Sequence, residues 1–150
     1  MSALRELYQE VILDHNKAPR NFRKMADANR TIEGYNPLCG DHYTVYLKLE
    51  DGIILDVSFE GAGCAISKAS ASVMSSLVKG KSKAEATEMF ERFHLLVTGG
   101  MNGDVDLETL GKLAAFGGVS EFPARVKCAS LAWHTMKAAI DSNEPTVSTE

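Results

Sequence analysis

The stretch NPLCGDHYTVYLKLEDGIILDVSFEGAGC, residues 36–64, decides the fold. Apolar and polar side chains alternate on both sides of the Asp-Gly pair at 51–52, a pattern typical of two half-buried strands that form a hairpin. A two-residue turn would place Leu47 opposite Asp56 and mix charge into the apolar face. We therefore expect a three-residue loop over 50–52, which pairs apolar residues along the whole hairpin.

The same register predicts that two cysteines meet at the open end of the hairpin. Cys39 lies on a Pro/Gly turn before the first strand, and it falls opposite Gly63, the neighbour of Cys64. Asp41 points from the same side of the strand as Cys39 and falls opposite Gly61. Cys64 begins a predicted helix, and a helix N-terminus favours the thiolate form of a cysteine.

Hydrophobic periodicity outside the hairpin predicts several helices and one short strand. We expect the strand over 31–35 and helices over 3–17, from Cys64 to Gly80, from a capping box at Ser82 to about 98, from Asp106 to about 117, and from Ser120 to about 141. Residues 1–142 are expected to form a single domain. The tail over 143–150 is expected to be disordered.

Composition excludes several classes of function. The formal net charge of −4 and the absence of a Lys/Arg block argue against a nucleic-acid-binding or anionic-membrane surface. The N-terminal stretch interleaves charged and apolar residues, so it predicts neither a signal peptide nor a membrane span. We expect a cytoplasmic protein, in which the three cysteines would be thiols or metal ligands.

The third cysteine, Cys128, lies on the last predicted helix and points away from the core stripe that runs from Val126 to Ile140. The hairpin mouth, a helix N-terminus and the last helix can therefore each contribute one thiol to one place, with Asp41 as a fourth ligand. Thiols suit zinc, copper(I) or iron-sulfur centres. Without a Cys-x-x-Cys pair, spacing alone leaves inert thiols as the alternative. The four histidines are interpreted as surface or hydrogen-bonded side chains, with His42 the substitute if Asp41 is not a ligand.

Four motifs carry a resemblance to a known family: LYQEVILDHNKAPRNF at 7–22, NPLCGD at 36–41, FEGAGCAISKASASVM at 59–74 and RVKCASLAWHTM at 125–136. They resemble the iron-sulfur cluster assembly scaffold family of IscU and the NifU N-terminal domain, most closely its SufU branch. The resemblance implies an α+β fold of the SufE/NifU-like type, a small antiparallel sheet of about three strands with helices packed on one face. It also implies the ligand set Cys39, Asp41, Cys64 and Cys128.

The resemblance further implies a zinc-dependent sulfurtransferase that accepts persulfide sulfur from a cysteine desulfurase of the SufS type and serves downstream iron-sulfur assembly proteins. We expect Cys39 to be the acceptor because its turn is flanked by glycine, whereas Cys64 and Cys128 lie on helices. Arg125 is expected to contact the partner or its persulfide. The alternatives are a scaffold on which an iron-sulfur cluster is built, and a structural zinc or redox-thiol domain.

Overall fold

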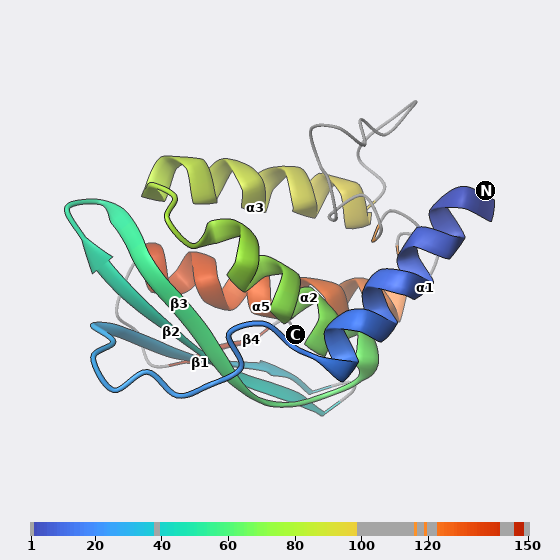
Figure 1. The fold of residues 1–150 in the computed structure, drawn as a ribbon, viewed down its shortest axis with the longest axis horizontal. Helices are drawn as coiled ribbons and strands as arrows, with labels where there is room; N and C mark the ends of the chain where they lie inside the picture. The colour runs from blue at the N-terminus through green and yellow to red at the C-terminus, as the bar shows by residue number, and fades with distance from the viewer. Residues whose placement is uncertain are drawn as a thin grey trace.

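The computed structural model describes residues 2–37, 40–98, 116, 119, 123–141 and 146–148. Its elements are α1 (Ser2–Lys17), β1 (Arg30–Asn36), β2 (Asp41–Glu50), β3 (Ile53–Ala62), α2 (Ala65–Val78), α3 (Lys83–Thr98), α5 (Pro123–Asp141) and β4 (Thr146–Ser148). The sheet has the order β3-β2-β1-β4, with β1, β2 and β3 antiparallel. The helices lie on one side of it (Figure 1), so the expected α+β architecture is confirmed.

Helix α5 occupies the centre of the molecule. It contacts β1 and β2 of the sheet and also helices α2 and α3. Its buried apolar residues therefore surround the helix, and they are Cys128, Ala129, Leu131, Ala132, Trp133, Met136, Ala139 and Ile140. The predicted core stripe from Val126 to Ile140 accounts for only some of these buried residues. A helix that packs against other elements on both sides buries more than one face.

The predicted hairpin loop is wrong. β2 and β3 are joined by a two-residue turn, in which Asp51 and Gly52 both have positive φ, as a type I′ turn requires. A register shift beyond Leu49 then restores apolar pairing, with Leu47 opposite Val57. This β-bulge removes the clash of charge with the apolar face that had argued against the short turn.

The new register changes which residues meet at the open end of the hairpin. Tyr43, rather than Asp41, pairs with Gly61, and β3 ends at Ala62 opposite His42. Asp41 itself pairs with Asn36 at the end of β1. The first residue of β2 is therefore placed next to the segment that leads from β3 into α2.

Helix α2 packs against α5, and four of its five serines, Ser67, Ser70, Ser72 and Ser75, are buried. The hydroxyl of Ser70 donates to the carbonyl of Ala129 at 2.5 Å, which lets the two helices approach closely. Helix α3 begins with the predicted capping box, which the structure confirms. The amide of Glu85 donates to Ser82 Oγ at 3.1 Å, and the amide of Ser82 donates to Glu85 Oε1 at 3.0 Å.

The C-terminal tail contains a strand that the sequence analysis did not foresee. Residues Thr146–Ser148 pair in parallel with β1, although disorder was expected over 143–150. Backbone pairing with the exposed edge of a strand needs no apolar pattern, so hydrophobic periodicity does not reveal it. The helix predicted from Asp106 to about 117 lies outside the described residues, except for Phe116. Among the helices of the described segments, none is both long and apolar enough to span a membrane.

Candidate metal centre

Three potential metal ligands converge from three elements of the fold. Asp41 begins β2, Cys64 precedes α2 and Cys128 lies on α5. One ligand atom from each, a carboxylate oxygen and two Sγ atoms, lie within 4.8 Å of one another. Asp41 and Cys128 are buried, whereas Cys64 is half-buried. The cluster therefore has two interior members and one member at the surface.

Backbone geometry holds Cys64 in place as the N-cap of α2. Its extended conformation lets Sγ accept a hydrogen bond from the amide of Ser67 at 3.4 Å. The amide of Cys64 donates a hydrogen bond to Asp41 Oδ1 at 2.9 Å. This hydrogen bond links the aspartate directly to the N-terminus of α2. The preceding residue must be glycine, because a Cβ at Gly63 would lie 2.6 Å from Asp41 Oδ1.

The amide of Asn36 connects the other two members of the cluster. Its Nδ2 donates to Asp41 Oδ2 at 3.2 Å and to Cys128 Sγ at 3.5 Å. Asn36 is fully buried at the end of β1. The position of Cys128, in the first half of α5, is thereby fixed relative to the sheet.

Tyr43 lies beside the cluster within the core. Its hydroxyl is 3.0 Å from Ser67 Oγ. Burial, followed by the nearby charges of Asp41, Cys64 and Cys128, raises the pKa of Tyr43 to about 12, against the opposing effect of the Ser67 hydrogen bond. Tyr43 is therefore a neutral phenol next to the acidic cluster.

The donor set and its spacing suit a metal ion that prefers sulfur ligands. Around a tetrahedral zinc ion with bonds of about 2.3 Å, sulfur atoms lie about 3.8 Å apart. The three ligand atoms, within 4.8 Å of each other, are close to that arrangement before any metal draws them together. Two thiols and one carboxylate leave one tetrahedral position for a fourth ligand.

The expected fourth ligand, Cys39, lies outside the described residues. The ends of its loop are described. The amide of Gly40 donates to the carbonyl of Asn36 at 2.9 Å, and Gly40 has a positive φ of 74°. Asn36 and Gly40, which stand on either side of Cys39 in the sequence, are therefore hydrogen-bonded to each other directly before Asp41.

The remaining expectations concern histidines and Arg125. None of the four histidines, all of which the structure describes, belongs to the cluster. His42 points away and lies 3.3 Å from Glu33, stacked on Tyr35. Arg125 is exposed in the first turn of α5, three residues before Cys128.

The sequence analysis did not identify the residues that surround the cluster. Asn36, Gly63 and Ser67 are not ligand types for zinc, and only the tertiary contacts show what they do. A partial signal was present for two of them, because Asn36 and Gly63 stand within the NPLCGD and GAGC motifs.

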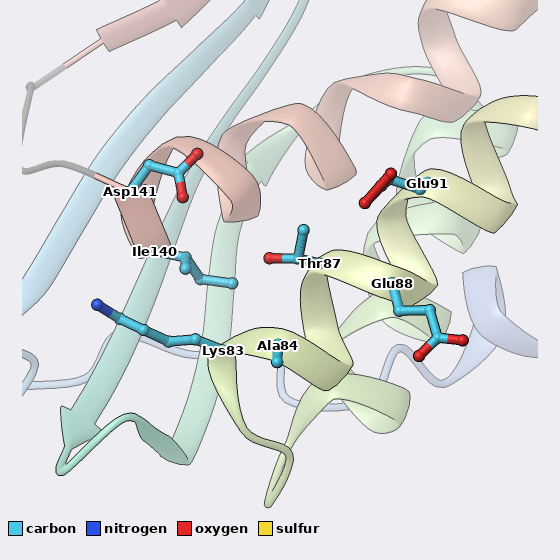
Figure 2. Close-up of a pocket in the computed structure, with 7 residues that line it drawn as sticks. All are labelled: Lys83, Ala84, Thr87, Glu88, Glu91, Ile140 and Asp141. Carbon is cyan, nitrogen blue, oxygen red and sulfur yellow. The ribbon is translucent and has the colours of Figure 1, made fainter.

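A separate pocket lies between α3 and the end of α5. Figure 2 shows Lys83, Glu88 and Glu91 from α3 and Asp141 from α5 around it. Its volume is about 490 Å³, and it includes no thiol or imidazole. The pocket is open and shares no residue with the cluster, so it does not define the chemistry of the protein.

Residues 7–129 match the protein family described as the NifU-like N-terminal domain. The chain belongs to this family. It is 41% identical over 139 residues to the zinc-dependent sulfurtransferase SufU of Bacillus subtilis, with 92% of each chain covered. It is also 39% identical to the iron-sulfur cluster assembly scaffold protein IscU of Streptococcus pyogenes, covering 93% of this chain and 86% of that protein.

Solved structures of family members share the fold. One is the putative iron-sulfur cluster assembly scaffold protein for the SUF system from Fervidobacterium islandicum. It superposes with a TM-score of 0.81 at 38% identity, covering 91% of this chain and 98% of that one. The expected resemblance to the IscU and NifU family, with SufU among the relatives, is thus confirmed.

Proposed function

We propose that this family member is a zinc-dependent sulfurtransferase of iron-sulfur cluster assembly, which accepts persulfide sulfur from a cysteine desulfurase. The observation that carries the proposal is the convergence of Asp41, Cys64 and Cys128 within 4.8 Å. Two thiols and a carboxylate form a donor set that suits zinc. A relative that is 41% identical over nearly the whole chain is named as a zinc-dependent sulfurtransferase.

Asp41, Cys64 and Cys128 would hold the zinc ion together with Cys39. A bound zinc ion supplies positive charge that keeps its cysteine ligands deprotonated near neutral pH. Cys64 and Cys128 are fixed by helices, and Asp41 is fixed by hydrogen bonds from Cys64 and Asn36. Cys39 stands between Pro37 and Gly40 in the sequence that joins β1 to β2, so we propose it as the ligand that leaves the site and acts as a nucleophile.

In the proposed transfer, the Cys39 thiolate attacks the terminal sulfur of a persulfide on the desulfurase. A sulfur–sulfur bond forms at Cys39 while the sulfur–sulfur bond of the donor breaks. The desulfurase cysteine leaves as a thiolate, and the transferred sulfur keeps the protonation state that it had in the donor persulfide. Atoms and electrons balance without an external oxidant or reductant.

Arg125 is proposed to contact the desulfurase or its persulfide. Its exposed position, three residues before Cys128, places a permanent positive charge on the same helix as one ligand. A persulfide is largely anionic near neutral pH, so the positive charge of a guanidinium on this helix would favour the approach of the persulfide. We place the protein in the cytoplasm, with a desulfurase of the SufS type before it and iron-sulfur assembly proteins after it.

A scaffold function is the second candidate. It is favoured by relatives such as the Streptococcus pyogenes protein, which is named as an iron-sulfur cluster assembly scaffold. The same cysteines and Asp41 would then hold iron rather than zinc. Anaerobic reconstitution with iron and sulfide, followed by visible absorption spectra, separates the two functions. Stable cluster absorption at stoichiometric yield would favour the scaffold.

Substitution of the three cysteines tests the sulfurtransferase proposal. Cys64→Ser and Cys128→Ser should each lose most of the zinc and become less stable, because each removes a ligand that a helix holds in place. Cys39→Ser should retain substantial zinc but accept no sulfur, since a serine hydroxyl is not ionised near neutral pH. Each variant is incubated with a cysteine desulfurase and cysteine. Zinc content and added sulfur, located by mass spectrometry of intact and digested protein, are the measurements.

A pair of aspartate variants provides the matched control. Asp41→Asn should weaken zinc binding, whereas Asp51→Asn, in the turn at the far end of the hairpin, should not. Sulfur found on Cys64 or Cys128 of the wild type, with Cys39 unmodified, would refute the assignment of the acceptor. A wild type that binds zinc but neither accepts sulfur nor stimulates the desulfurase would indicate the structural zinc domain instead.

A further inference from the structure

The side chain of Asn36 forms hydrogen bonds to two different members of the cluster. One amide group donates to a carboxylate oxygen of Asp41 and to the sulfur of Cys128. These two residues come from β2 and α5, elements far apart along the chain.

The orientation of this amide is set by charge. Both of its neighbours are acceptors, and both become anionic when they bind a metal. The opposite orientation would direct the amide oxygen at a carboxylate and a thiolate, in a site with no solvent exposure. The two hydrogens of Nδ2 therefore form hydrogen bonds to Asp41 and Cys128. These two bonds fix the separation of the two ligands.

The backbone of Asn36 connects the amide to the loop that carries Cys39. Its carbonyl accepts from the amide of Gly40 at 2.9 Å, and the residue pairs with Asp41 across the sheet. One residue thus holds two ligands through its side chain and closes the base of the loop through its main chain.

We propose that Asn36 is a positioning residue that holds Asp41 and Cys128 at the spacing a metal ion requires. This inference rests on the metal centre proposed above and adds a residue outside the ligand set. Partners that hydrogen-bond to metal ligands orient them and tune their donor strength, and substitution of such partners lowers metal affinity about 10- to 100-fold.

The test compares Asn36→Leu, which keeps the size of the side chain but removes both donors, with Asn29→Leu. Asn29 also bridges through its amide, to the backbone of Leu49 at the other end of the β1–β2 pair. Asn36→Ser is a second variant in case leucine prevents folding, which circular dichroism would show. Zinc affinity is measured by competition with a chromophoric chelator. Each protein is also saturated with Co²⁺ to record its ligand-field and sulfur-to-cobalt absorption.

We expect the Asn36 variants to bind zinc about 10- to 100-fold more weakly and to show altered cobalt spectra at saturation, while Asn29→Leu resembles the wild type in both. An altered spectrum reports ligand geometry, which a general loss of stability would not change. Asn36 variants with the affinity and spectrum of the wild type would refute this inference and leave the metal centre intact. A wild type that binds neither ion would refute the metal centre itself.

Discussion

At the scale of single residues, the sequence could predict the candidate metal ligands, because their chemistry depends on residue type. It could not predict the residues around them, because their roles depend on tertiary contacts. Asp41, Cys64 and Cys128 could be proposed from the sequence because few side chains bind soft metals, and the structure brings these three together. Asn36 and Tyr43 have no such signature. Their roles follow from partners on β2, α2 and α5, which the sequence does not specify locally.

Tyr43 gives a pH dependence that can be measured. Its pKa is about 12 in the folded protein and about 10 in an unfolded chain, so folding favours the neutral phenol. Its contribution to stability is fully present below pH 10 and is lost as the pH rises through about 12. We expect the free energy of unfolding to fall more steeply with pH in this window for the wild type than for Tyr43→Phe, by up to about 1.4 kcal/mol per pH unit. Urea unfolding of both proteins across the window checks this, and equal slopes would contradict it.

At the scale of secondary structure, local sequence signals predicted the starts of helices α2 and α3 correctly, whereas the predicted register of the β2–β3 hairpin was wrong. The capping box at Ser82 and the helix start at Cys64 are encoded by neighbouring residues, and both are confirmed. The hairpin register depends on whether the pairing contains a bulge. The alternation of the sequence is satisfied either by a longer loop or by a short turn with one extra residue in β3, at Leu55, so pattern alone could not choose.

The capping box predicts the effect of one substitution on helix α3. Ser82→Ala removes the acceptor for the amide of Glu85 and should lower the free energy of unfolding by about 1 kcal/mol. Ser76→Ala is the control, because this serine is exposed inside α2 and caps no helix end. Its effect should stay within about 0.5 kcal/mol. Chemical denaturation measures both, and equal effects would show that the cap does not stabilise α3.

At the scale of the whole molecule, the cluster joins parts of the chain that are distant in sequence. Asp41 lies on the sheet, Cys64 lies directly before α2, and Cys128 lies on the central helix α5. A metal ion bound there contacts the native arrangement only, because the unfolded chain does not hold the three ligands together. Metal binding should therefore stabilise the entire fold rather than one element.

Removal of the metal tests this coupling. A strong chelator should lower the midpoint of thermal unfolding of the metal-loaded protein, and free metal at 100 times its dissociation constant adds about 2.7 kcal/mol. Cys64→Ser has one ligand fewer and should respond much less to the chelator. Differential scanning calorimetry with and without chelator gives both shifts. Identical midpoints for the wild type under the two conditions would contradict a metal that stabilises the fold.

The central position of α5 has a consequence for how the protein is made. Residues 2–98 emerge from the ribosome first, yet the apolar faces of β1, β2, α2 and α3 meet on a helix that is synthesised after them. Those faces cannot be fully covered, and the thiol of Cys128 cannot join Asp41 and Cys64, until α5 has left the exit tunnel. The three-residue cluster can therefore form only after α5 has been synthesised.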